Sequence, residues 1–261
     1  MKLQRQLILL LILSSAILSS CQQGSAPSEP EDIFPTQVGT TWKYNVSIDT
    51  ATAGNNNFIP SGSIEVRIVG IQQLDGREAT VVVTKTTPLV GEPTTDTAFY
   101  AYENNRRDQL VYLRNAQVLI GGAGGIGDIT GFRSGWYPLI RTSGGVGSTY
   151  TILNTQVSSP FEGVGTVTIA IRAEGKVEAN EQITVNNRTY NTIRVSIDIK
   201  TKLRTPPPFS SEITIDAPIR VWVARNVGIV RQEATLLLRG AGTQLTTTAR
   251  VRQELQSITG N

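Results

Sequence analysis

The side chains that most often carry enzyme chemistry are scarce in this sequence of 261 residues. It contains no histidine and one cysteine, Cys21. Without histidine the chain cannot form a Ser-His-Asp triad, a Cys-His pair or a zinc helix of the H-E-x-x-H type. One cysteine also excludes a disulfide within the chain. The residue types therefore favour a protein without catalytic residues.

Residues 122–127 read Gly-Ala-Gly-Gly-Ile-Gly, which matches the glycine pattern of dinucleotide-binding proteins. That pattern needs a helix directly after it, whose N-terminus holds the pyrophosphate, and an acidic residue about 20 positions further on. Gly131 and Pro138 would break such a helix, and no acidic residue occurs between Asp128 and Glu162. We interpret the segment as a glycine loop and expect no cofactor.

The charged residues form no recognisable site. Glu174, Glu178 and Glu181 lie close together in the sequence, as do Asp96 and Glu103, but both groups alternate with polar residues, as solvated strands and turns do. The carboxylates lack the spacing of a calcium loop, so we expect no metal site. Basic residues occur as short pairs close to acidic residues, which argues against nucleic-acid binding.

The single cysteine follows a targeting pattern. Lys2 and Arg5 precede an apolar stretch of 12 residues, 7–18, which is shorter than the about 20 residues that span a bilayer as a helix. This is the pattern of a signal peptide. Residues 18–21 read Leu-Ser-Ser-Cys, which resembles the lipobox of bacterial lipoproteins. The resemblance implies that the Cys21 thiol receives a diacylglycerol and that the chain is cleaved in front of it.

Cleavage would make residues 1–20 a lipoprotein signal peptide and leave a nearly neutral chain. It removes two of the 24 basic residues, so the formal net charge falls from +3 to +1. Residues 21–31 are polar and contain proline and glycine, which predicts a flexible stalk. We expect the diacylglycerol on Cys21 to hold the protein at the cell membrane or outer membrane, on the extracytoplasmic side.

From residue 32 onward the dominant hydrophobic period is two. Trp42, Tyr44 and Val46 alternate with polar residues, which is typical of a strand with one face in water. Because one-sided strands are typical of antiparallel sheets, we expect residues 32–261 to form a single antiparallel β domain. The predicted class is all-β with minor helix, as a large curved sheet or open β-barrel. The predicted strands are 42–48, 64–74, 78–86, 97–103, 109–114, 150–157, 164–173, 193–199, 212–216, 219–224, 228–239 and 244–255.

Glycine and proline locate the connections between these strands. Asp75-Gly76 predicts a two-residue hairpin turn, and we interpret segments 121–147 and 205–208 as loops. Segments 34–42 and 137–150 are similar: in each, an aromatic-Pro pair precedes Val-Gly, two hydroxyl residues and an aromatic residue. This similarity is either coincidental or indicates two similar halves of one sheet.

Aromatic residues are the remaining candidates for binding. Trp42, Tyr44, Trp136 and Trp222 recur near strand starts beside glycine or proline. They either fill the core of the sheet or line an apolar concavity that binds a lipid or sugar. These four residues are our candidate ligand-binding site.

Three segments resemble a group of bacterial lipoproteins and secreted proteins that are related in fold to the lipoprotein-carrier (LolA-like) proteins. Residues 34–44 are similar to the group's opening pattern P-x-x-x-G-x-x-W-x-Y, and residues 183–195 to a strand-turn-strand unit. Residues 221–231 are similar to W-x-A-x-G-V-G-x-V-K, with Asn226 in place of a glycine. The resemblance implies a strongly curved sheet around an apolar hollow and no catalytic residues.

The sequence therefore predicts a non-enzymatic, membrane-anchored lipoprotein whose concave sheet binds a lipid or another hydrophobic ligand. The alternative is a cell-envelope module that binds a protein or glycan through a sheet edge or loops. An enzyme with two facing carboxylates is the least favoured class.

Overall fold

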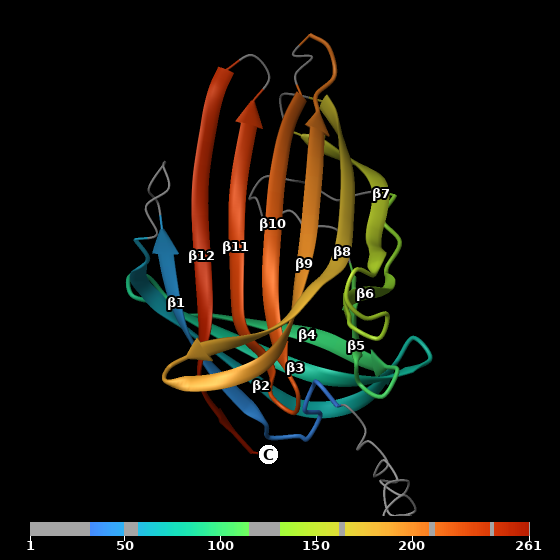
Figure 1. The fold of residues 1–261 in the computed structure, drawn as a ribbon. Helices are drawn as coiled ribbons and strands as arrows, with labels where there is room; N and C mark the ends of the chain where they lie inside the picture. Colours follow the sequence, from blue (N-terminus) through green and yellow to red (C-terminus); the bar gives the residue numbers. More distant parts are fainter. Residues whose placement is uncertain are drawn as a thin grey trace, which may run out of the picture. The chain divides into compact units, whose positions relative to one another are not determined.

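The part of the chain that the structure describes forms twelve antiparallel strands (Figure 1). The computed structural model describes residues 32–49, 57–114, 131–161, 165–208, 212–240 and 243–260. These residues form strands and no helix, which confirms the predicted all-β class. The strands are β1 (Thr41–Asp49), β2 (Ile59–Leu74), β3 (Arg77–Pro88), β4 (Thr94–Glu103), β5 (Asp108–Leu113), β6 (Gly135–Arg141), β7 (Thr149–Phe161), β8 (Gly165–Val185), β9 (Arg188–Arg204), β10 (Glu212–Ala224), β11 (Gly228–Gly240) and β12 (Thr243–Thr259).

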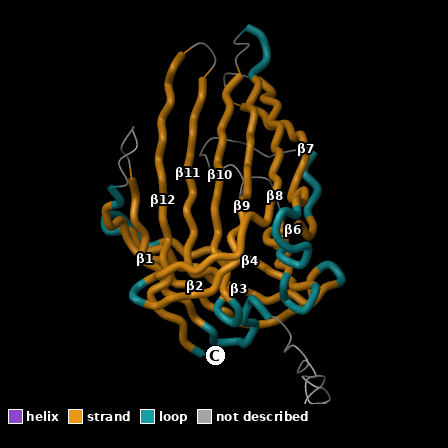
Figure 2. The backbone as a smooth tube through the Cα atoms, viewed as in Figure 1, coloured by secondary structure: helices purple, strands orange, loops and turns teal. Residues whose placement is uncertain are grey.

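The strands belong to one sheet with the order β6-β5-β4-β3-β2-β1-β12-β11-β10-β9-β8-β7. The sheet is thus two meanders, β1–β6 and β7–β12, that meet where β1 pairs with β12. It curves into a nearly closed barrel, in which β8–β12 form an upright wall and β2–β4 run across its lower end (Figures 1 and 2). This confirms the predicted curved antiparallel sheet.

The two edge strands, β6 and β7, meet at the seam of this barrel. The Tyr150 hydroxyl of β7 donates a hydrogen bond to the Leu139 carbonyl of β6 at 3.0 Å. Tyr150 is paired with Gly175 of β8, where an added Cβ would overlap the phenol ring. The missing side chain at Gly175 therefore gives Tyr150 the space to reach the opposite edge.

The similarity between segments 34–42 and 137–150 has a structural counterpart. The N–H of Gly39 donates to the Ile68 carbonyl, and the Ile68 N–H donates back to the residue after the glycine, at 2.9 and 3.0 Å. In the second segment, the Gly147 N–H donates to the Val177 carbonyl at 2.8 Å, and the Val177 N–H donates to the carbonyl of Ser148, the residue after the glycine, at 2.9 Å. Both glycines have positive φ, +97° and +90°, which glycine adopts without steric cost. Thus β1 and β7 enter the sheet in the same way.

Three connections differ from the prediction. Residues 174–192 lay between two predicted strands, but β8 continues to Val185 and β9 begins at Arg188, so only a two-residue turn separates them. Segment 121–147 was expected to be a loop, but its residues 135–141 form β6, because Trp136 pairs with Tyr112 of β5 and their rings contact edge to face. Segments 212–216 and 219–224 were expected to be separate strands but are both part of β10. Pro218 lacks an N–H, and there the ladder to β11 is interrupted while pairing with β9 continues.

The predicted turn at Asp75-Gly76 is confirmed, since φ is positive at both residues, 48° and 75°. Asn226 also has a positive φ of 56°, as its place in the turn between β10 and β11 requires.

Residues 32–261 form one compact unit. Because the described residues contain no helix, none of them forms a helical membrane span. The predicted signal peptide, Cys21 and the stalk lie outside the described residues.

Candidate functional site

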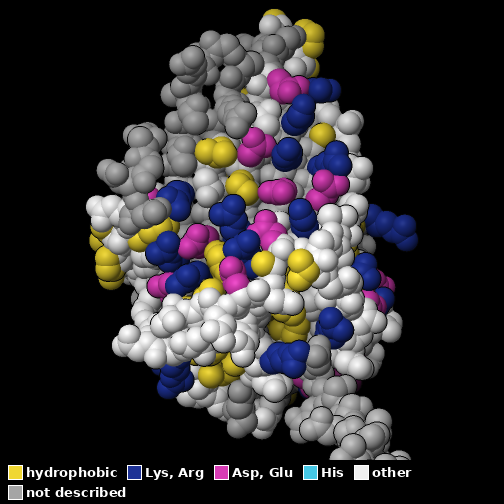
Figure 3. Space-filling model, in the orientation of Figure 1, with side chains coloured by type: hydrophobic (Ala, Val, Ile, Leu, Met, Phe, Trp, Pro, Cys, Tyr) yellow, Lys and Arg dark blue, Asp and Glu magenta, His cyan; other side chains and the backbone are white. Residues whose placement is uncertain are grey.

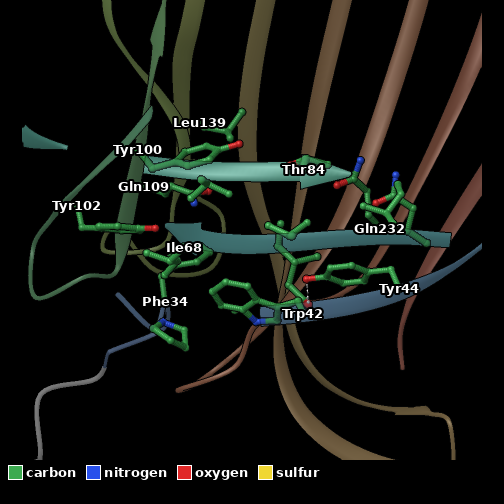
Figure 4. Close-up of a pocket in the computed structure, with 17 residues that line it drawn as sticks. Phe34, Trp42, Tyr44, Ile68, Thr84, Tyr100, Tyr102, Gln109, Leu139 and Gln232 are labelled. Atoms are coloured by element: carbon green, nitrogen blue, oxygen red, sulfur yellow. Dashed lines mark hydrogen bonds between the residues drawn. The ribbon is translucent and has the colours of Figure 1, made fainter. Parts of the chain in front are cut away.

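A cavity of about 270 Å³ lies between strands β1–β5 and strands β11 and β12 (Figure 4). Its volume is close to the lower end of the about 300–1,000 Å³ that is usual for small-ligand pockets. Aliphatic side chains form much of the wall, and none of the described residues that line it is charged. The aromatic lining residues are Phe34, Trp42, Tyr44, Tyr100 and Tyr102, and the polar ones are Thr84, Gln109, Gln232 and Gln253.

Two of the four predicted ligand-binding residues, Trp42 and Tyr44, line this cavity. They lie two positions apart on β1 and so share one face of the strand. Trp42 Nε1 donates to the Val227 carbonyl at 2.6 Å, and the Tyr44 hydroxyl donates to the Ile229 carbonyl at 3.0 Å. Gly228 lies between these two acceptors, and a Cβ there would touch Trp42 Nε1. The polar ends of both side chains are thus bound to β11 and the turn before it, which fixes both rings in place.

Trp222 is not among the lining residues, because it lies on the other face of β10. It is paired with Arg231, whose guanidinium lies 5.8 Å from the indole centroid. Arg231 precedes the cavity residue Gln232, so Arg231 and Trp222 point away from the cavity. The indole Nε1 donates to Glu181 Oε1 at 2.6 Å, and Ile183 of β8 and Tyr190 of β9 pack against the core cluster that contains Trp222.

Trp136 also lies outside the cavity lining. Its ring contacts Tyr112 edge to face, with the centroids 5.2 Å apart. Its indole Nε1 donates to the Leu74 carbonyl at 3.2 Å. The side chain thus joins β6 at the edge of the sheet to the end of β2.

Sequence reasoning missed Phe34, Tyr100, Tyr102 and Gln109 as cavity residues. Tyr100 and Tyr102 occupy alternate positions of β4, so their spacing was a usable signal for a shared face. Phe34 lies 5.7 Å from the ring of Tyr102 between centroids, and it belongs to the segment that resembles 137–150. Gln109 carries no sequence signal, because a single glutamine at the start of a strand is ordinary.

The tyrosines of the cavity stay uncharged at neutral pH. Burial raises the pKa of Tyr44 and of Tyr100 above the ordinary value. Burial also raises the pKa of Tyr102, and a side-chain hydrogen bond with Gln109 opposes part of that rise. These hydroxyl groups therefore remain neutral hydrogen-bonding groups.

A buried carboxylate fixes the strand that carries Gln109. Asp108, the first residue of β5, accepts hydrogen bonds from the backbone N–H groups of Thr142 and Ser143 at 2.9 and 3.0 Å. It also accepts them from the Ser143 hydroxyl and the Asn104 amide, both at 2.6 Å. Burial alone would raise the pKa of Asp108, but these bonds and the nearby Arg141 lower it below its ordinary value. The carboxylate thus ties the start of β5 to the end of β6.

Charged side chains gather on the face of β11 and β12 that points away from the cavity. Gln232 and Gln253 are paired across these strands and line the cavity, whereas their sequence neighbours carry charges. Arg231 forms an ion pair with Glu254 at 2.6 Å, and Arg252 forms one with Glu233 at 2.9 Å. Figure 3 shows basic and acidic side chains interspersed over this wall. The two faces of the wall therefore differ in charge.

The three glutamates that lie close together in the sequence are bound to arginines. Glu178 and Glu181 both pair with Arg194, at 2.7 and 2.9 Å, and Glu174 pairs with Arg172 at 2.7 Å. Within the described part of the chain, no group of three or more histidine, cysteine, aspartate or glutamate residues could hold a metal ion. The glycine motif 122–127 lies outside the described residues.

No protein-family model and no curated protein matches this sequence. Its fold is similar to that of a solved structure described as a putative lipoprotein from Parabacteroides distasonis ATCC 8503, with a TM-score of 0.51 and 14% sequence identity over 88% of this chain and 99% of that chain. It is also similar to a putative exported protein with a YmcC-like fold from Bacteroides fragilis NCTC 9343, with a TM-score of 0.50 and 12% identity over 88% of this chain and 100% of that one. At these identities, the similarity shows that the chain shares the fold of these two proteins.

Proposed function

We propose that this chain is a non-enzymatic, extracytoplasmic lipoprotein that binds a lipid or another hydrophobic ligand in the cavity between β1–β5 and β11–β12. The observation that carries the proposal is the lining of that cavity, which combines five aromatic residues with aliphatic ones and no charged residue. A solvent-filled hollow of this composition is unfavourable, because each Å² of apolar surface left in water costs about 25 cal/mol. An apolar occupant would remove that cost.

The construction of the cavity also supports binding. Trp42 and Tyr44 are held by hydrogen bonds to β11 and the turn before it, so their rings do not have to be ordered when a ligand enters. Rings that are fixed in advance reduce the entropy lost on binding. Apart from Phe34 and Pro35, which precede β1, the lining residues come from strands of a single sheet, and rigid elements hold a site more accurately than loops do.

The membrane anchor in this proposal is a diacylglycerol on Cys21. The sequence pattern at residues 18–21 supports it, and so do the descriptions of the two similar structures as a putative lipoprotein and a putative exported protein. The relation to the lipoprotein-carrier proteins that segments 34–44, 183–195 and 221–231 predicted is part of the proposal as well. In such a relation the cavity would be the place where the hydrophobic cargo resides.

A fluorescence titration tests ligand binding. The full chain with Cys21→Ser, which cannot be acylated, is titrated with an apolar naphthylamine dye that fluoresces when it leaves water. We expect saturable binding of one dye molecule per chain and its displacement by lipids. A folded protein that gives no saturable signal would refute the cavity as a binding site.

The alternative function, a protein- or glycan-binding module of the cell envelope, is favoured by one feature. Leu89 and Val90, which directly follow β3, are 67% and 91% exposed. A photocrosslinking residue at Val90 would test this alternative in cells. One reproducible crosslinked partner, absent when the crosslinker is moved to the exposed Thr97, would support it, whereas identical products at both positions would count against it.

A further inference from the structure

We propose that the cavity selects an uncharged ligand with a hydrogen-bond donor, such as the hydroxyl group of a long-chain alcohol or an acylglycerol, and that Gln109 Oε1 accepts this bond. The inference rests on the proposed function, since it names the ligand chemistry of the same cavity. One buried oxygen without a hydrogen-bond partner and the absence of charge among the described lining residues support this selectivity.

Gln109 is a buried polar residue in the cavity wall. Its side chain lies between Tyr100 and Tyr102 (Figure 4), and the residue is only 7% exposed. Within the described ranges, its buried Oε1 has no hydrogen-bond partner. A buried acceptor without a donor costs about 1–3 kcal/mol, and native structures contain few such atoms. The unpaired oxygen therefore points to a donor that enters the cavity from outside the chain.

The neighbouring polar groups do not satisfy this oxygen. Trp42 and Tyr44 already donate to backbone carbonyls of Val227 and Ile229. Gln109 also forms a side-chain hydrogen bond with Tyr102, and because Oε1 has no partner, the amide N–H group is the donor in it. The oxygen is the part of the amide that is left for a ligand.

The lining also determines the charge of the ligand. An ionised carboxylate, phosphate or ammonium group would lose its water shell without meeting a countercharge, because no charged residue is among the described lining residues. Burying an unpaired charge costs several kcal/mol. A carboxylate would moreover bring acceptors toward Gln109 Oε1, which is itself an acceptor. A hydroxyl group is neutral and donates one proton, so it matches the site.

Two isomers of one composition isolate the contribution of the donor. Octan-1-ol and heptyl methyl ether contain the same atoms, but only the alcohol can donate a hydrogen bond. Each is used to displace the naphthylamine dye from the Cys21→Ser chain. We expect the alcohol to bind about fivefold more tightly, as one hydrogen bond of about 1 kcal/mol predicts, and octanoate at neutral pH to bind more weakly than either isomer.

Two variants assign this preference to Gln109. Gln109→Met keeps a side chain of similar length but removes the acceptor, and it should abolish the preference for the alcohol over the ether. Gln232→Met, on the opposite wall, is the matched control and should retain the preference. If Gln109→Met does not fold, the affinities of the parent protein for the two isomers alone decide whether the cavity prefers a hydrogen-bond donor.

The outcomes separate this inference from the proposed function. Equal affinities for the two isomers on the parent protein, as expected if a water molecule satisfies Gln109, would overturn the inference although the dye still binds. A preference that survives Gln109→Met would also overturn it. A folded protein that binds neither dye nor isomers would overturn the proposed function itself.

Discussion

The indole Nε1 of Trp42 donates a hydrogen bond of 2.6 Å to the carbonyl of Val227, which lies 185 positions further along the chain. The bond joins β1, from the first meander, to the turn between β10 and β11 in the second. One side chain thus connects the two halves of the sheet and forms part of the cavity wall. This dual role, which Tyr44 shares through its bond to the Ile229 carbonyl, couples stability and binding at Trp42.

Replacing Trp42 by phenylalanine should therefore weaken both properties. The variant leaves the Val227 carbonyl without its donor and removes part of a buried ring, so we expect a loss of about 1–3 kcal/mol in the free energy of unfolding. Urea denaturation measures this loss, and dye titration measures binding. Trp136→Phe is the control, because Trp136 lies outside the cavity lining; it should leave dye affinity unchanged. Equal effects of both variants on binding would contradict this role of Trp42.

The seam between β6 and β7 should depend on the space beside Tyr150. Gly175→Ala places a Cβ where the ring lies, and we expect it to cost about 1–3 kcal/mol through overpacking. Gly70→Ala is the matched control, since a Cβ at Gly70 of β2 meets no atom within 4 Å. Because both changes act on the Tyr150 ring, Gly175→Ala should lower the free energy of unfolding by less in a Tyr150→Ala protein than in the parent protein. Additive losses in urea denaturation would show that Gly175 has another role.

Asp108 should make the stability depend on pH on the acidic side. Its pKa is lowered in the folded state, so its contribution is complete above the unfolded pKa of about 3.9 and is lost as the pH falls through the folded pKa. Asp108→Asn should lower the free energy of unfolding at pH 7 by about 1.5–3 kcal/mol, with a difference that shrinks at pH values below about 4. Urea titrations across this range measure the difference. Asp96→Asn, on the exposed start of β4, should show little change, and a constant difference for Asp108→Asn would contradict the assignment.

The sequence predicted the class of this fold because half-buried strands leave a period of two in their residues. In β8, Val167, Ile169 and Ile171 are buried and alternate with more exposed residues, as the one-sided pattern requires. The strand β6 was missed because six glycines before Gly135 and three after Arg141 dominated the segment. What holds β6 in the sheet is pairing with β5, which is a tertiary contact between residues that are distant in the sequence.

The candidate site could be predicted only in part for the same reason. Trp42 and Tyr44 were selected by type and do line the cavity, whereas Trp222 was selected by the same criterion and lies on the opposite face of its strand. The sequence does not tell which face of a strand points to the cavity when both faces are buried. Gln109 became visible only when the structure showed a buried oxygen without a donor.

The central claim, that the cavity holds a hydrophobic ligand, is tested most directly by mass spectrometry of the molecules that co-purify with the Cys21→Ser chain. Three proteins are compared: the parent, Thr84→Trp, which fills the cavity, and Thr97→Trp, which places the same ring on an exposed position of β4. We predict one class of apolar molecule in the parent and in Thr97→Trp, and at least about tenfold less of it in Thr84→Trp, equivalent to about 1.4 kcal/mol of lost binding. No apolar molecule in the parent, or equal amounts in all three folded proteins, would contradict the account.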